Sequence, residues 1–439
     1  MENQGIRDAR TLGTSKILVL GLQHMFAMFG ATVLVPALTG LSVSATLLFA
    51  GLGTLLFHFL AKGKIPAFLG SSFAYLAGYA AIAPKGEAAL LPYACVGVAC
   101  SGLLYLVLAA LVKSFGTQRV MRFFPPIVTG PIIICIGMTL ANSAINNCNG
   151  SWGIALIAIA TVVLFSIWGK GMFRIIPILM GVLVSYVAAA VMGKVDFSGV
   201  ASAAWIGIPV KMENTVFSLI GNCDTNLLIT AIIAIMPIAF ATMIEHIGDI
   251  CAISSTVGEN FIEDPGLHRT LMGDGIATTV ASLFGAPANT TYGENTGVLA
   301  LTKVYDPLVV RIAAVFAILA SFCPKFSALV SAMPVGTIGG VSLILYGMIS
   351  AIGVRNLVEN HVDLTKSRNV MVASLIMSLA LGITFSAAGA ISFSVGSITL
   401  RFSGLAVAAI VGIVLNAVLP ENDFVFSSEY KHGKLEKKD

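Results

Sequence analysis

Four acidic side chains lie within strongly hydrophobic sequence: Glu245, Asp249, Asp274 and Glu294. A carboxylate inside a bilayer is costly unless it is paired, hydrated or protonated. Glu245 and Asp249 are four residues apart, so they share one face if their segment is a helix. Because two close carboxylates in a medium of low dielectric constant do not both ionise comfortably, one of them should carry a proton. The four residues therefore predict a polar site inside a membrane transporter, with proton coupling as its chemistry.

Two short segments of the apolar sequence are not typical of helices. Residues 70–78 (GSSFAYLAG) and 289–297 (NTTYGENTG) predict a few extended residues followed by a half-helix. A helix that begins inside the membrane leaves N–H groups unpaired at its positive end. The backbone at Phe73 and Gly293 should therefore donate to a ligand, and the rings of Phe73 and Tyr292 offer flat faces for stacking. The hydroxyls that can satisfy neighbouring backbone groups are those of Ser71, Ser72, Thr290 and Thr291.

An alternative interpretation is that the acids only hold helices together, protonated or hydrogen-bonded to Ser and Thr. It applies chiefly to Asp249 and Asp274, which could support the site without touching a ligand. His24 and His246 also lie in apolar sequence, and we interpret both as hydrogen-bonded packing residues. His246 directly follows Glu245, so on a helix the two side chains point about 100° apart and do not face one ligand.

The composition is that of a membrane protein. Of 439 residues, 57% are hydrophobic and 10% are charged, and the mean hydropathy is +0.93, whereas soluble domains are about 25% charged. The first apolar run, residues 17–38, is too long for the core of a signal peptide. Seven scattered cysteines without a CxxC pair predict neither a disulfide framework nor a metal site. No phosphate loop, nucleophilic triad or nucleic-acid motif is present, so we expect no cofactor, no enzymatic activity and no nucleic-acid partner.

Hydropathy predicts an all-α polytopic protein with fourteen membrane segments, and short extended stretches in segments 3 and 10. The approximate ranges of the segments are 17–38, 42–61, 70–83, 88–112, 120–142, 152–169, 173–193, 226–251, 267–285, 288–302, 307–326, 333–353, 369–389 and 402–419. This count places 20 of the 25 Lys and Arg residues on the side of both termini and five on the other. The positive-inside rule therefore predicts a multi-pass protein of the cytoplasmic (inner) membrane with both termini in the cytoplasm.

The sequence also contains a weak internal repeat. Residues 71–78 match residues 290–297, and residues 23–24 (QH) resemble residues 245–246 (EH). Together these matches indicate that seven segments are duplicated. Because seven is odd, the second copy must be inverted in the membrane. A 7+7 inverted repeat with paired broken helices is typical of transporters whose substrate site lies where the breaks meet.

Several of these motifs resemble a known family. The similarity is to the nucleobase–ascorbate transporter (nucleobase:cation symporter-2) family, and within it to the bacterial uracil permeases. The residues that carry it are 23–36 (QHMFAMFGATVLVP), 70–74 (GSSFA), 244–248 (IEHIG), 264–269 (DPGLHR) and 289–295 (NTTYGEN). The resemblance extends from about residue 23 to about residue 418. Glu294 is similar to the acid of uracil carriers, at a position where purine carriers typically have Gln.

The resemblance implies a core domain of spans 1–4 and 8–11 and a gate domain of spans 5–7 and 12–14. The core then comprises residues 17–112 and 226–326, and the gate comprises residues 113–200 and 327–420. Residues 201–225 would form an extracytoplasmic connection, with cytoplasmic tails at residues 1–16 and 421–439. Assembly into a homodimer is left open.

The resemblance further implies that the substrate is held between the short strands of spans 3 and 10. Glu245 and Glu294 would bind the base, and the backbone of Phe73 and Gly293 would donate to its carbonyls. The rest of the pocket would be lined by Ala31, Ser72, Tyr292 and, from the gate side, Tyr346. Uracil presents two N–H donors and two carbonyl acceptors in one plane, which carboxylates and backbone N–H groups complement.

We therefore expect a uracil:proton symporter that works by alternating access, with uracil, protons and membrane lipids as its partners. Two residues depart from the uracil carriers. Asp249 stands where many of them have His, and Asp274 resembles an acid that is more usual in purine carriers. A xanthine or urate symporter of the same family is therefore an alternative. An anion exchanger or channel of the same architecture is another, although four acids and no arginine at the broken helices argue against anions.

Overall fold

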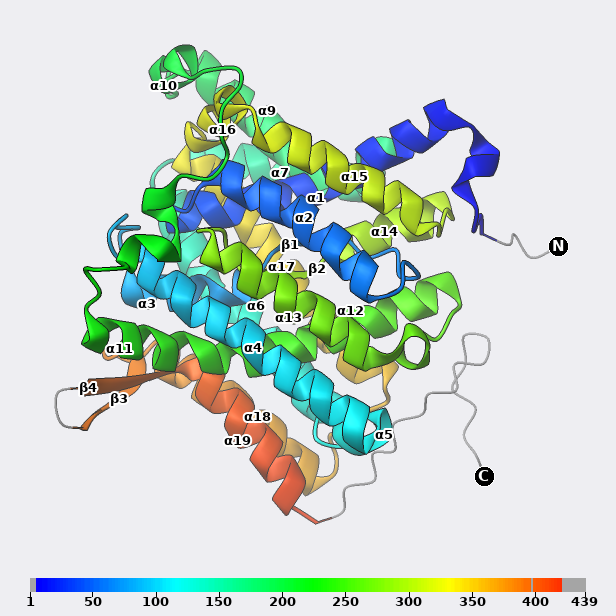
Figure 1. Ribbon diagram of the computed structural model, residues 1–439, viewed down its shortest axis with the longest axis vertical. Helices are drawn as coiled ribbons and strands as arrows, with labels where there is room; N and C mark the ends of the chain where they lie inside the picture. The colour runs from blue at the N-terminus through cyan, green and yellow to red at the C-terminus, as the bar shows by residue number, and fades with distance from the viewer. Residues whose placement is uncertain (1–4, 396–397, 421–439) are drawn as a thin grey trace.

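The computed structural model describes residues 5–395 and 398–420, and most of this chain is helical (Figure 1). Within these residues, seven helical segments are long and apolar enough to cross a membrane. They are α1 (Thr14–Thr39), α2 (Val43–Leu60), α4 (Leu91–Phe115), α6 (Pro126–Asn149), α11 (Thr225–Ile235) continued by α12 (Ala239–Val257), α17 (Val335–Glu359) and α18 (Ser367–Thr384). The pair α15 (Pro307–Ser321) and α16 (Pro324–Ser331), bent by 87°, becomes an eighth if it is one span. The protein is thus a helical membrane protein, and the count of fourteen segments stays a prediction.

The other apolar segments form shorter helices. These are α3 (Leu76–Ile82), α7 (Trp152–Trp168), α9 (Pro177–Val191), α13 (Leu267–Leu283), α14 (Gly293–Thr302) and α19 (Gly404–Val418), joined by the small helices α5 (Thr117–Met121), α8 (Met172–Ile175) and α10 (Ser198–Ser202). α3 and α14 are short because a strand precedes each of them in its segment. The strands β1 (Leu69–Ser71) and β2 (Asn289–Thr291) are the extended stretches that the sequence predicts, and they pair with each other in antiparallel fashion.

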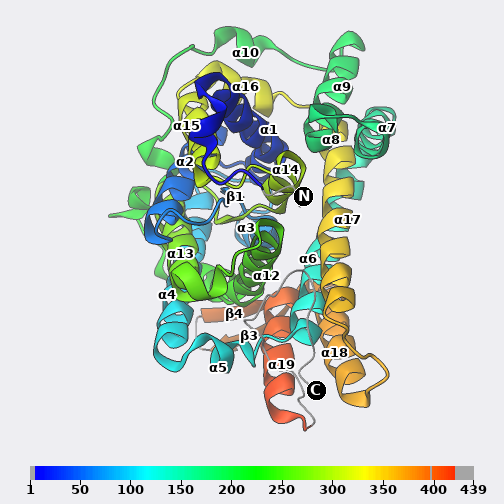
Figure 2. The same ribbon diagram turned by 90° about the vertical axis from the view of Figure 1, so that its right-hand side faces the viewer.

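Figure 2 shows two groups of helices side by side. In one group, α13 packs between α2 and α4, and α15 packs against α1 and α2. In the other, α17 packs along α6 and α7, and α7 packs along α9. The acid-bearing helix α12 lies between the groups, because it contacts α14 on one side and both α6 and α19 on the other. Helix α12 is therefore one of the elements through which the two groups contact each other, and α1, which contacts α9 and α17, is another.

The described part of the N-terminal tail is bound to the helical body. Ile6 forms a parallel bridge with Val304, and the N–H of Ala9 donates to Oδ2 of Asp306 at 2.8 Å. Arg7 forms an ion pair with Glu259 and also donates to the carbonyl of Val257 at 3.1 Å. The predicted tail at residues 1–16 is therefore partly folded, and α1 begins earlier than expected, at Thr14. The predicted tail at residues 421–439 lies outside the described residues.

The all-α prediction is wrong between the last two helices. Residues there form an antiparallel hairpin of β3 (Ala390–Val395) and β4 (Ile398–Ser403), where the sequence interpretation placed a connection and the start of a span. Residues 390–395 (AISFSV) and 398–403 (ITLRFS) largely alternate apolar and polar side chains, and this period of two is the pattern of strands. The apolar composition alone did not distinguish this strand pattern from the end of a helix.

Helices α4 and α13 approach each other closely because two glycines meet. A Cβ on Gly102 would lie 2.2 Å from Oγ1 of Thr279 and 2.5 Å from the carbonyl oxygen of Gly275. This contact holds α13, the helix that carries Asp274, against α4 of the first group of helices. Gly382 in α18 is exposed, and a Cβ there would have nothing within 4 Å.

Gly102→Ala should lower the melting temperature of the purified protein by several degrees, because overpacking a close contact costs about 1–3 kcal/mol. Gly382→Ala is the matched control. It should leave the melting temperature unchanged or raise it slightly, since Ala is favoured over Gly in a helix by about 1 kcal/mol. Both values come from thermal unfolding in the same detergent, and equal melting temperatures for the two variants would contradict the close contact.

Candidate functional site

A ribbon of two short strands forms the centre of the candidate site. Leu69 pairs with Thr291 and Ser71 with Asn289, and all six strand residues are buried. Two further hydrogen bonds extend the ribbon. The N–H of Ser72 donates to the carbonyl of Ala288 at 2.9 Å, and the N–H of Tyr292 donates to the carbonyl of Phe68 at 3.0 Å.

Each strand of the ribbon leads directly into a helix. After β1, a 3-10 turn over Phe73–Tyr75 continues into α3, and after β2 the helix α14 begins at Gly293. Because the strands are antiparallel, the two helices leave the ribbon from its opposite ends. Each helix N-terminus has free N–H groups and a positive partial charge. The ribbon therefore presents two backbone donor groups, one at the buried Phe73 and one at the exposed Gly293.

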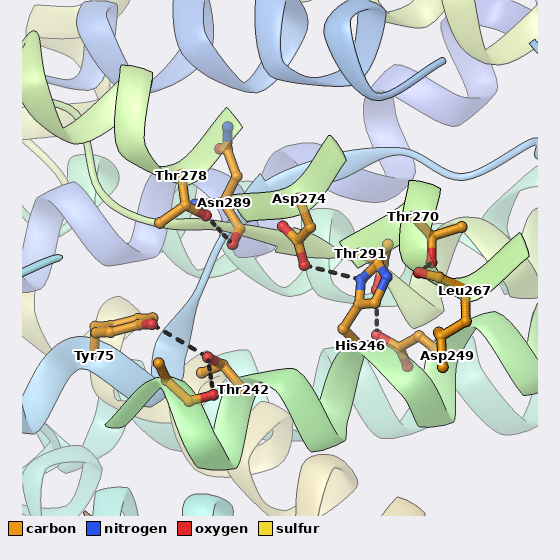
Figure 3. Close-up of polar contacts among 11 residues, drawn as sticks. Tyr75, Thr242, His246, Asp249, Leu267, Thr270, Asp274, Thr278, Asn289 and Thr291 are labelled. Carbon is orange, nitrogen blue, oxygen red and sulfur yellow. Dashed lines mark hydrogen bonds and ion pairs between the residues drawn. The ribbon is translucent and has the colours of Figure 1, made fainter. Parts of the chain in front are cut away.

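Helix α12 is hydrogen-bonded to both broken segments (Figure 3). Thr242 lies 3.2 Å from the hydroxyl of Tyr75, in the turn after β1. The hydroxyl of Thr291, in β2, donates to Oδ2 of Asp249 at 2.8 Å. Asp249 thus has a partner inside the protein and holds the second strand against α12.

A second acid also has an internal partner. Oδ2 of Asp274, on α13, lies 2.9 Å from Nδ1 of His246, and both side chains are fully buried. The contact is at ion-pair distance but outside the geometry of a well-aligned hydrogen bond. It joins α12 to α13 on the side of α12 that His246 faces (Figure 3). The arrangement of Asp249 and Asp274 agrees with the interpretation that these acids support the site without touching a ligand.

The two glutamates are placed differently. Glu245 is half-buried, and its Oε2 atom is buried without a hydrogen-bond partner in the described part of the chain. Glu294 is half-buried in the first turn of α14, where the positive end of the helix favours a negative charge. Glu245 lies within electrostatic range of Asp274 and Glu294, and Asp249 lies within range of all three, so the four acids form one electrostatic group.

Tyr292 connects the ribbon to α1. Its hydroxyl donates to the carbonyl of Ser71 at 2.9 Å and lies 3.3 Å from the hydroxyl of Thr32, while the Ser71 hydroxyl donates to the carbonyl of Thr32 at 3.0 Å. A Cβ on Gly70 would lie 2.4 Å from the Tyr292 ring, so glycine is required where the ring crosses β1. The ring of Tyr292 is therefore packed directly against β1.

The remaining predicted site residues lie around the ribbon. Phe73 contacts Tyr346 of α17 edge-to-face, with 5.8 Å between the ring centroids, and this contact joins the two groups of helices. Ala31 is buried in α1, and the Ser72 hydroxyl is buried without a partner among the described residues. Two cavities, of about 280 Å³ near Arg7 and about 70 Å³ near Tyr79, lie away from the ribbon.

Two polar residues of the site have no role in the sequence interpretation. The Asn295 amide donates to the carbonyl of His24 at 3.0 Å and lies 3.1 Å from its Nδ1 atom, which joins α14 to α1. The Asn289 amide donates to the carbonyl of Phe49 at 3.2 Å and joins β2 to α2. The only sequence signal for either is its place in the segment NTTYGEN. Within the described residues, no group of three or more His, Cys, Asp and Glu side chains is placed to hold a metal ion.

Comparisons with known proteins agree with this architecture. Residues 15–389 match the model of the Xan_ur_permease family, described as "Permease family". The chain is 41% identical over 426 residues to a uracil permease of Bacillus caldolyticus, with 94% of each chain covered. It is 40% identical over 432 residues to a uracil permease of Bacillus subtilis (strain 168), with 95% of each covered. The transmembrane domain of a cyanobacterial bicarbonate transporter has a similar fold, with a TM-score of 0.57 and 13% identity over 94% of this chain and 99% of that one.

These matches differ in what they establish. The bicarbonate transporter shares the fold alone, since its sequence identity is low. The family model spans most of the sequence, and both relatives are permeases that align over nearly their full length. The chain therefore belongs to this permease family and is a multi-pass membrane transporter rather than an enzyme.

Proposed function

We propose that this protein imports uracil across the cytoplasmic membrane together with protons. The observation that carries the proposal is the pairing of β1 with β2, which brings the two strand-to-helix segments together. Glu294 lies in the first turn of one of them, and Glu245 keeps an oxygen without a hydrogen-bond partner among the described residues. Both relatives described above are uracil permeases. The donors and acceptors of this site complement the planar edge of uracil.

In the proposed complex, Glu245 and Glu294 accept hydrogen bonds from the two N–H groups of the base. The backbone N–H groups at Phe73 and Gly293 donate to its carbonyls, because they belong to helix ends that lack internal acceptors. The pocket is completed by Ala31, Ser72, Tyr292 and Tyr346. The contact between Phe73 and Tyr346 closes the site on the α17 side, so it must open for the substrate to pass.

We further propose fourteen membrane segments in a 7+7 inverted repeat, with the first group of helices as the core and the second as the gate. The two strand-to-helix segments support the repeat, since each strand is followed by a helix that begins two to five residues later. Alternating access follows from movement of the core against the gate. The distribution of Lys and Arg supports a cytoplasmic position for both termini.

Proton coupling is proposed to involve Glu245, Asp249, Asp274 and Glu294. Asp249 is hydrogen-bonded to Thr291, so a change in its protonation acts on β2 directly. Asp274 is fully buried with its Oδ2 atom 2.9 Å from Nδ1 of His246, so in the proposed complex it does not contact the base. The resemblance of Asp274 to an acid of purine carriers favoured a xanthine or urate symporter, and this contact argues against that alternative.

Radiolabelled uracil should accumulate in proteoliposomes when an inside-alkaline pH gradient is imposed without sodium. Unlabelled uracil should compete fully, and a tenfold higher concentration of xanthine should compete poorly, because both relatives described above are uracil permeases and xanthine carries an additional fused ring. Competition by xanthine equal to that by uracil would establish the purine alternative. Accumulation that depends strictly on sodium at a fixed pH gradient would overturn the proton coupling.

Glu294→Gln should weaken uracil binding by about one to two orders of magnitude, because a hydrogen bond to a charged group contributes roughly 1.5–3 kcal/mol. Equilibrium binding of radiolabelled uracil to purified protein measures this. Glu263→Gln, at an exposed acid, is the matched control and should bind as the unaltered protein does. Unchanged affinity in Glu294→Gln would remove Glu294 from the site.

Asp249→Asn should leave uracil binding at equilibrium within about threefold and reduce gradient-driven accumulation at least tenfold. The Asn side chain can still accept the hydrogen bond of Thr291, but it cannot exchange a proton. Binding and accumulation are measured on the same preparation, with Asp196→Asn as the exposed control. Loss of binding in folded Asp249→Asn would mean that Asp249 contacts the base itself.

A further inference from the structure

Two buried threonines hold the first residue of each strand of the ribbon. Oγ1 of Thr54, in α2, accepts from the N–H of Leu69 at 2.9 Å and lies 3.2 Å from the carbonyl oxygen of the same residue. Oγ1 of Thr278, in α13, accepts from the N–H of Asn289 at 3.2 Å and donates to its carbonyl at 3.0 Å (Figure 3). Both threonine side chains are at most 1% exposed.

The position of these contacts follows from the pairing of the strands. In an antiparallel pair, alternate residues direct their N–H and C=O groups away from the partner strand. The hydrogen bonds from Tyr292 to Phe68 and from Ser72 to Ala288 fix the register, so the backbone groups of Leu69 and Asn289 point outward. A two-stranded ribbon has no third strand to pair with them.

An unpaired backbone group is expensive where water is absent. A threonine hydroxyl can accept from an N–H and donate to a carbonyl, so one side chain takes the place of a neighbouring strand at each edge. The proton of Thr54 is shared with the carbonyl of Ala50, at 2.8 Å, whereas the hydroxyl of Thr278 is hydrogen-bonded to Asn289 alone among the described residues.

Other buried threonines of the same helices do not act in this way. Thr46 in α2 donates to the carbonyl of Ser42 at 2.7 Å, and Thr270 in α13 donates to the carbonyl of Leu267 at 3.0 Å (Figure 3). These bonds stay within or at the start of the threonine's own helix. Thr46 and Thr270 are therefore natural controls for Thr54 and Thr278.

The two clamped residues have equivalent places relative to the helix N-termini. Phe73 lies four residues after Leu69, and Gly293 lies four residues after Asn289. We propose that Thr54 and Thr278 are positioning residues, which fix the strands and through them the backbone donors at Phe73 and Gly293. Their effect on uracil rests on the function proposed above, whereas their effect on the ribbon does not.

The test compares Thr54→Val and Thr278→Val with Thr46→Val and Thr270→Val. Valine keeps the shape of threonine and removes the hydroxyl, and Thr54→Ser and Thr278→Ser restore the hydroxyl. The first measurement is hydrogen exchange of peptides that cover residues 66–75 and 286–295, on purified protein without ligand. The second is equilibrium binding of radiolabelled uracil.

Thr54→Val should raise exchange at Leu69 about tenfold, and Thr278→Val should do the same at Asn289, since each leaves a buried N–H unpaired. Uracil affinity should fall about tenfold in both. The serine variants should recover both quantities, and the control variants should change neither. Because the clamps act on different strands, either valine variant tests the proposal if the other does not fold.

Two results would overturn the proposal. One is unchanged exchange at the clamped residue in a folded valine variant. The other is an equal effect of Thr46→Val or Thr270→Val, which would show a general loss of packing. If the unaltered protein fails to bind uracil, the proposed function is wrong, and the exchange measurement still decides whether the threonines hold the ribbon.

Discussion

The structure depends on one constraint, which is that backbone N–H and C=O groups buried away from water must find partners. Helices satisfy their own groups, but the segments at Leu69–Ser71 and Asn289–Thr291 are extended and cannot do so. Each strand pairs with the other, and the hydroxyls of Thr54, Thr278 and Tyr292 satisfy outward groups of the ribbon. The helices α1, α2, α12 and α13 are arranged around the ribbon by these same bonds and those of Asp249.

The four acids also differ in whether they have partners inside the protein. Asp249 accepts a hydrogen bond from Thr291, and Asp274 contacts His246 in a fully buried position, while the half-buried Glu245 keeps an oxygen without a hydrogen-bond partner among the described residues. The two acids with internal partners join α12 to β2 and to α13, so their side chains help to fix the position of the ribbon. A free acceptor beside two helix ends is the arrangement that a ligand with N–H and C=O groups can complete.

Much of this arrangement follows from sequence because it is local. The density of glycine and hydroxyl residues at 70–78 and 289–297 disfavours a continuous apolar helix, and the four-residue spacing of Glu245 and Asp249 places both on one face of α12. The partners of the acids are not local. Thr291 is 42 residues from Asp249, and which side chains meet depends on the rotation of packed helices, which no pattern in one segment records. Hydropathy also measures apolar content rather than geometry, so it did not distinguish the hairpin β3–β4 from membrane helix or connection.

The ribbon has a consequence for how the chain is made. The hydrogen bond between Tyr292 and Ser71 joins residues that are 221 positions apart, so β1 is synthesised long before its partner exists. At translation rates of about 5–20 residues per second, the delay is on the order of ten seconds or more. During that interval the first broken segment lacks the strand that completes it, and it must be shielded by the insertion machinery or by lipid headgroups and water. The second half of the protein thus acts as the folding template for the first, and a nascent chain released before residue 289 leaves the membrane segment around β1 unfinished.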